Sequence, residues 1–187
     1  RYRLACRLGM VLVILSSSCT KDHLVRPKEG AGATVLVPGV PFYPQDDFQC
    51  GPAALATVVN YWNKRLGSAA RVTVQSITDE IYSPTAKGVL GLDLELYANR
   101  HGFSAHRYRG TIADLRDLVD RRIPPIILLD MGFGLFRADH FVVVTGYTTG
   151  GLLANTGRAE NEFLSDEKVN SSWKKTGYWT LVIRPRD

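Results

Sequence analysis

Cys50 stands at the start of the segment CGPAALATVVNYW, which has the residue spacing of an amphipathic helix. Pro52 is typical of a first helical turn, and Val58, Val59 and Trp62 recur at helical spacing. A thiol at a helix start meets unpaired N–H groups and the positive end of the helix dipole, and both favour the thiolate. Cys50 is therefore a candidate nucleophile, with a small buried hydrophobe as the alternative.

His140 begins the apolar run FVVVTGY, at the mouth of a predicted central strand. A thiolate–imidazolium pair needs its two groups on different elements that come within hydrogen-bond reach, as a helix packed on a sheet provides. We therefore expect His140 to act as base and acid for Cys50, with a purely structural histidine as the alternative. Of the other histidines, we expect His23 in a solvated tether and His101 and His106 at the surface.

A third residue should orient the His140 ring through its other nitrogen. Asn155 ends the predicted strand that returns from His140, so a hairpin could bring the Asn155 amide beside the ring. Asp139 is the alternative, but neighbouring residues on a strand point to opposite faces. The sequence favours Asn155 and leaves Asp139 open.

Gln45 lies five residues before Cys50 in a predicted loop, where its amide N–H could meet an oxyanion beside the Cys50 N–H. Gln49 is a rival, although its position next to Cys50 makes the required direction harder to reach. The sequence has no phosphate-binding glycine loop, no GxSxG motif and no HExxH motif. We therefore expect no cofactor and no metal site.

The first 18 residues have a basic start, a short apolar run and small residues before Cys19, as a signal peptide does. The ending Ser-Ser-Ser-Cys resembles a bacterial lipoprotein signal, in which the cysteine is lipidated after cleavage. Ser16 stands where such signals usually have Leu, so an ordinary secretory signal is the alternative. We predict a signal peptide over 1–18, a flexible tether over 19–34 and one domain over 35–187.

Cysteine counting supports a chemical role for Cys50. Cys6 would leave with the signal and Cys19 would be lipidated, so Cys50 could form no internal disulfide. Thr20 and Lys21 follow Cys19 without the Asp that commonly signals inner-membrane retention. We therefore expect a lipid anchor in the outer membrane, with the domain facing the periplasm.

The charge of the chain does not favour a nucleic-acid partner. Arg1, Arg3 and Arg7 contribute three charges to the net charge of +5, so a chain beginning at Cys19 carries +2. No stripe of basic and aromatic residues follows. With 187 residues, 45% of them hydrophobic, the chain suits one globular domain.

The elements that would position these residues are mainly helical in the first half and mainly strands in the second. This order favours an α+β fold over an alternating α/β fold. One predicted helix begins at residue 50, and the others cover 73–82, 88–102 and 111–122. The predicted strands cover 34–43, 103–110, 124–132 and 177–185, and residues 140–157 are predicted as two strands joined by a turn at Gly150-Gly151.

The stretch PFYPQDDFQCGPAALATVVNYW, followed by DHFVVVTGY, resembles the bacteriocin-processing, double-glycine type of cysteine peptidase, over most of 38–183. The resemblance implies a papain-like fold in which Cys50 is the nucleophile, His140 the base and acid, and Gln45 the oxyanion donor. Relatives usually have Ala-Asp-Pro where this chain has Ala-Asn155-Thr, although papain-like enzymes more broadly use Asn there. Many relatives are fused to an export transporter, and we expect a free-standing envelope peptidase.

Together these residues predict a lipid-anchored cysteine peptidase that cleaves peptide or protein substrates in the bacterial envelope through Cys50, His140, Asn155 and Gln45. The same residues could instead transfer an acyl group to an amine or hydrolyse a non-peptide amide. A catalytically silent peptide-binding module would be a third possibility, because fold alone does not fix function.

Overall fold

The computed structural model describes residues 33–45, 49–85, 88–132 and 138–186. The predicted signal peptide, most of the tether and Cys19 lie outside these residues. In chain order the elements are β1 Val35–Leu36, α1 Cys50–Arg65, α2 Val74–Ile81, α3 Gly91–Arg100, β2 Phe103–Arg109, α4 Ile112–Asp120, β3 Ile126–Asp130, β4 Asp139–Thr148, β5 Gly151–Asn155, β6 Glu162–Ser165, α5 Asp166–Lys175 and β7 Trp179–Pro185.

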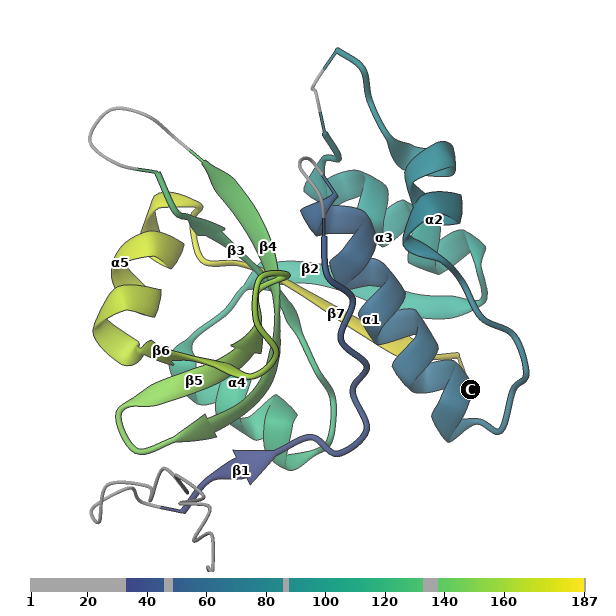
Figure 1. The fold of residues 1–187 in the computed structure, drawn as a ribbon. Helices are drawn as coiled ribbons and strands as arrows, with labels where there is room; N and C mark the ends of the chain where they lie inside the picture. Colours follow the sequence, from purple (N-terminus) through teal and green to yellow (C-terminus); the bar gives the residue numbers. More distant parts are fainter. Residues whose placement is uncertain (1–32, 46–48, 86–87, 133–137, 187) are drawn as a thin grey trace, which may run out of the picture.

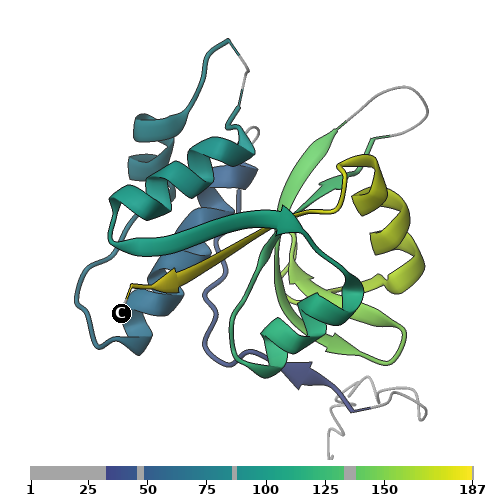
Figure 2. The ribbon, with the colours of Figure 1, turned by 180° about the vertical axis from the view of Figure 1, so that it is seen from behind.

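A curved antiparallel sheet forms one side of the molecule, and α1, α2 and α3 form the other (Figure 1). The strand order is β2-β7-β3-β4-β5-β6, and β1 pairs with the far part of β4. Figure 2, which shows the molecule from behind, has the paired strands β2 and β7 in front of α1. The predicted α+β class is confirmed.

Helix α1 is the central helix, and every residue from Gly51 to Tyr61 is buried. Ala53, Ala54 and Ala56 keep its surface narrow, so α2, α3 and β4 can all pack closely against it. The positive charges of Lys64 and Arg65 in its last turn interact favourably with the negative end of the helix dipole.

Strand β4 separates two apolar cores. Phe141 and Val143 face the core shared with α1, α2 and α3, whereas Val142 and Val144 face the core that also holds α4 and α5 side chains. The alternation follows from the two-residue period of a strand. Because both faces of β4 are covered, its sequence is continuously apolar from Phe141 to Val144.

Most predicted elements are present in the described residues, including α4 with its Thr111–Asp114 capping box. Two elements were not predicted, namely β6 and α5. Helix α5 carries recognisable signals: Ser165 caps it through the Lys168 N–H, and acidic residues fill its first turn. Only Val169 and Trp173 of α5 are buried, so its apolar periodicity is weak.

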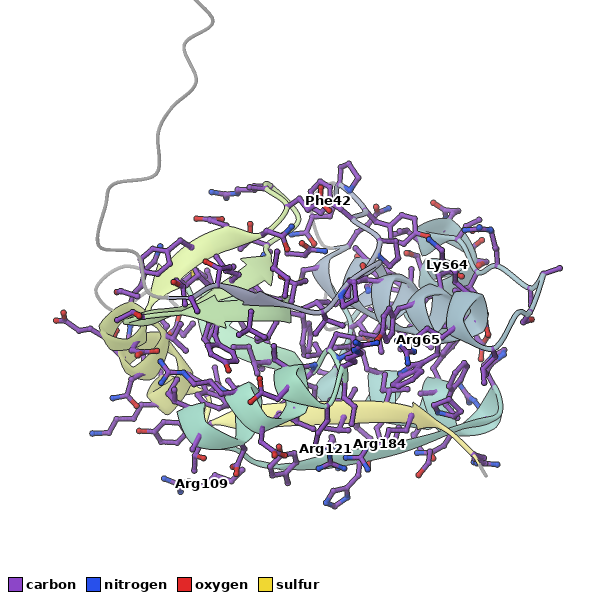
Figure 3. The ribbon with its side chains drawn as sticks, turned by 90° about the horizontal axis from the view of Figure 1, so that it is seen from below. Phe42, Lys64, Arg65, Arg109, Arg121 and Arg184 are labelled. Carbon is purple, nitrogen blue, oxygen red and sulfur yellow. The ribbon has the colours of Figure 1, made fainter. Side chains whose placement is uncertain are left out.

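A groove of about 480 Å³ lies on the face of β2 and β7 turned away from α1, with α4 as its wall. Figure 3 shows Arg121 and Arg184 beside each other at this groove. Asp114 and Asp117 also line it, and Arg121 forms an ion pair with Asp117 at 3.2 Å. The groove therefore combines both signs of charge.

Candidate active site

Helix α1 and strand β4 bring Cys50 and His140 together. Cys50 is the first residue of α1 and His140 is the second residue of β4, and these two elements pack against each other. The Cys50 thiol and the His140 imidazole are hydrogen-bonded. The predicted pairing of a helix-start thiol with a strand-start histidine is therefore present in the structure.

Burial alone would raise the pKa of the Cys50 thiol, but the groups around the sulfur outweigh it. The His140 side chain, the main-chain N–H of Phe141 and the main-chain N–H of Gly51 all hydrogen-bond to Cys50. The positive charge of His140 acts in the same direction, so the pKa of Cys50 lies below its ordinary value. This environment favours a thiolate.

Burial likewise would lower the pKa of His140, but the hydrogen bonds to Cys50 and to the Thr156 carbonyl outweigh it. The net result is a His140 pKa above its ordinary value, although the charge of Arg158 opposes the rise. A lowered thiol pKa beside a raised imidazole pKa is the condition for a thiolate–imidazolium pair. These two groups can therefore supply a nucleophile and a proton donor at the same pH.

The hairpin of β3 and β4 fixes the position of His140. His140 pairs with Leu129, and Asp130 closes the neck of the hairpin beside it. Asp130 Oδ1 accepts hydrogen bonds from Gly132 N at 2.9 Å and from Ala138 N at 3.1 Å. Asp130 is 5% exposed, so this carboxylate holds the start of β4 from within the fold.

Gln45 lies against the turn that follows β5. Its main-chain N–H donates to Gly157 O at 3.3 Å, and its side-chain Nε2 donates to Thr156 O at 3.1 Å. The same Nε2 lies 3.1 Å from His140 Nε2. Gly157 has a φ of +77°, a left-handed conformation that favours glycine, and a Cβ there would overlap the Gln45 side chain.

The sequence-predicted contact between Asn155 and His140 is not among the hydrogen bonds of the described residues. Asn155 ends β5 as predicted, but its Nδ2 donates to Pro41 O at 3.2 Å and its Oδ1 accepts from Asn161 N at 3.0 Å. In the register of β4 and β5, Asn155 is paired with Val143 and not with His140.

The ring of His140 instead contacts a main-chain atom, the carbonyl oxygen of Thr156, at 2.7 Å from Nε2. Sequence reasoning missed this partner because a carbonyl is present at every residue, and side-chain types do not reveal where it points. Arg158 was also missed, although Thr-Gly-Arg directly after a predicted strand marks a turn near the site.

The remaining predicted residues lie in varied places. Asp139 begins β4 and is exposed, and Gln49 precedes α1 without a side-chain cap. His101 is bound to Glu80 at the surface, and His106 lies in the groove beside α4. In the described part of the chain, no three His, Cys, Asp or Glu side chains gather as metal ligands would.

A helix that begins at a cysteine, packed on an antiparallel sheet whose central strand begins at a histidine, defines a papain-like cysteine peptidase fold. The sequence matches the model of the Peptidase C39-like family over residues 37–180. The chain therefore belongs to the Peptidase C39-like family and is a cysteine peptidase. No curated protein matches the sequence.

Solved structures share this fold. A protein described as a C39-like peptidase from Bacillus anthracis is 17% identical, with a TM-score of 0.67 over 83% of this chain and 99% of that chain. The peptidase domain of Streptococcus ComA, a bifunctional ABC transporter of a quorum-sensing pathway, is 23% identical, with a TM-score of 0.62 over 79% and 99%.

A double-glycine motif protease from an AMS/PCAT transporter, solved in complex with a leader peptide, is 22% identical. Its TM-score is 0.61 over 82% of this chain and 99% of that chain. At these identities the three structures support the fold, and the family match supports the peptidase class.

Proposed function

We propose that this chain hydrolyses peptide bonds of peptides or proteins in the bacterial envelope, with Cys50 as nucleophile and His140 as base and acid. The observation that carries the proposal is the hydrogen-bonded pair of Cys50 and His140, with the thiol pKa lowered and the imidazole pKa raised. Perturbed pKa values of this kind are typical of catalytic groups.

In the first half of the reaction, the Cys50 thiolate attacks the carbonyl carbon of the scissile bond. The carbonyl oxygen becomes an oxyanion, and the tetrahedral intermediate collapses when protonated His140 gives its proton to the leaving amine. The product is a thioester on Cys50. In the second half, neutral His140 takes a proton from water, the hydroxide attacks the thioester, and the acid product leaves as the thiolate–imidazolium pair returns.

The oxyanion needs hydrogen-bond donors, for which we propose the Cys50 main-chain N–H and the Gln45 side chain. The Cys50 N–H belongs to the first helical turn, which has no helical carbonyl to bind it. An amide nitrogen carries two hydrogens, so Gln45 Nε2 can bind Thr156 O with one and keep the other for the oxyanion. Removal of one such donor typically costs about 10²–10³ in rate.

We also propose that the first 34 residues direct export of the chain and its anchoring to a membrane. The basic start, apolar run and Ser-Ser-Ser-Cys19 ending support a lipidated, periplasm-facing protein in the outer membrane. None of the helices in the described ranges has the length and apolar character to cross a membrane. The leader peptide bound by the AMS/PCAT protease supports a peptide substrate for this chain.

The direct test is digestion of a peptide library in ¹⁸O-labelled water, with products identified by mass spectrometry. The wild-type chain should produce new C-termini that carry ¹⁸O, whereas Cys50→Ala and His140→Ala should produce none. His101→Ala is the matched control, since His101 is an exposed histidine bound to Glu80, and it should cleave as the wild type does.

Two results would contradict the proposed hydrolysis. Transfer of the acyl group to an added amine, without ¹⁸O uptake, would identify an acyl-transfer enzyme that uses the same Cys50–His140 pair. Binding of peptides without turnover would identify a silent peptide-binding module.

A further inference from the structure

The His140 ring has a short contact with the Thr156 carbonyl oxygen, 2.7 Å from Nε2. At this distance Nε2 must carry a hydrogen, because a bare nitrogen lone pair would face the lone pairs of the oxygen. A hydrogen on Nε2 leaves Nδ1 of the neutral ring as the atom that can take a proton from Cys50. The contact therefore selects the tautomer that the reaction needs.

Gln45 supports the same assignment. Its Nε2 lies 3.1 Å from Thr156 O and 3.1 Å from His140 Nε2. If both nitrogens donate to Thr156 O, each of the two lone pairs of that oxygen is used, and the nitrogens are neighbours because they share an acceptor. If Gln45 donated to His140 instead, the lone pair of Nε2 would be taken up, and no hydrogen would remain for the 2.7 Å contact.

The Thr156 carbonyl is held in place by the turn after β5. Thr156 Oγ1 donates to Glu162 Oε2 at 2.7 Å and accepts from Ala159 N at 3.3 Å. Thr156 N donates to Ala159 O at 3.1 Å, and the residue is only 5% exposed. The side chain of Thr156 thus fixes the direction of its own carbonyl.

We propose that the main-chain carbonyl of Thr156 orients His140 in this chain, with the Thr156 hydroxyl and Glu162 as positioning residues. The Asn155 side chain then forms hydrogen bonds with Pro41 and Asn161 that stabilise the turn after β5, and it does not bind the ring. The inference rests on the proposed roles of Cys50 and His140, and it assigns to a main-chain atom the task that the sequence suggested for a side chain.

The first test needs no substitution at the turn. Nuclear magnetic resonance of the chain labelled with ¹⁵N-histidine, recorded above the pKa of His140, reports which ring nitrogen carries the hydrogen. His140→Gln identifies the His140 signals. We expect a hydrogen on Nε2, and a hydrogen on Nδ1 would overturn the proposal.

The second test compares Thr156→Val, Thr156→Ser and Asn155→Ala in the same spectra and in peptide turnover. Thr156→Val removes the hydroxyl that holds the carbonyl in place, and it should lower the His140 pKa, because the hydrogen bond from the ring to the Thr156 carbonyl raises that pKa. It should also lower kcat about tenfold with little change in KM, the equivalent of one hydrogen bond lost in the transition state. Thr156→Ser keeps the hydroxyl and should restore both values.

Asn155→Ala should lower the stability of the chain but leave the His140 pKa and its tautomer unchanged. A shift of the His140 pKa in Asn155→Ala, with none in Thr156→Val, would show that Asn155 orients the ring. Failure of the proposed function can be distinguished from failure of this inference. A chain with the Nε2–H tautomer but no peptide turnover would contradict the peptidase role alone.

Discussion

The contact between Gln45 and Gly157 leads to a prediction about stability. In Gly157→Ala, the new Cβ would overlap the Cγ, Cδ and Nε2 atoms of Gln45. Gly157 also has a φ of +77°, which costs an L-residue about 1–2 kcal/mol. The substitution must therefore strain the backbone and also displace Gln45 from Thr156.

The matched control is Gly150→Ala, at the turn between β4 and β5. Gly150 has a φ of +81°, close to that of Gly157, but a Cβ there would meet nothing within 4 Å. Gly150→Ala should lower the free energy of unfolding by the backbone strain alone, about 1–2 kcal/mol. Gly157→Ala should cost about 1–3 kcal/mol more, because the side-chain and main-chain hydrogen bonds of Gln45 are each worth about 0.5–1.5 kcal/mol.

Urea unfolding of the single and double variants provides the assay. In a Gln45→Ala background the three overlapping atoms are gone, so Gly157→Ala should cost no more than Gly150→Ala does. The effects of Gln45→Ala and Gly157→Ala on the free energy of unfolding should therefore be non-additive. Equal costs for Gly157→Ala and Gly150→Ala in the wild-type background would refute the reasoning.

Three further predictions concern charge, the Asn155 amide and the anchor. Arg158→Gln should raise the His140 pKa and move the alkaline limb of kcat/KM to higher pH, because the charge of Arg158 lowers that pKa; an unchanged limb would contradict this. Asn155→Asp should lose the hydrogen bond to Pro41 O and lower the melting temperature; unchanged stability with higher kcat would instead favour Asn155 as the orienting residue. Metabolic labelling with a fatty-acid analogue should mark the outer-membrane fraction of wild type but not Cys19→Ala; a soluble, unlabelled wild-type product would rule out the anchor.

The sequence predicted the elements whose signals are local. The helix start at Cys50, the capping box of Thr111 and the apolar run after His140 each depend on a few neighbouring residues, and all three are present. Helix α5 was missed although Ser165 caps it, because with only two buried residues it lacks the apolar stripe that distinguishes a helix from a polar loop.

The pair of Cys50 and His140 could be predicted, since residue type and position within an element were enough. The partner of the ring could not, because it depends on the register of β4 and β5, and a shift of one residue turns every side chain to the other face. Asn155 is paired with Val143, and its amide binds Pro41 O and Asn161 N. The Thr156 carbonyl takes the position beside His140.

The claim that Cys50 and His140 form a thiolate–imidazolium pair is tested most directly by the pH dependence of Cys50 alkylation. Iodoacetamide labelling of the Cys50 peptide is followed by mass spectrometry in wild type and in His140→Ala. The wild-type rate should already be high near neutral pH, since the pKa of Cys50 lies below its ordinary value. His140→Ala should shift the profile to higher pH, because His140 is the largest of the influences that lower this pKa. Equal, slow labelling of both proteins near neutral pH would contradict the pair.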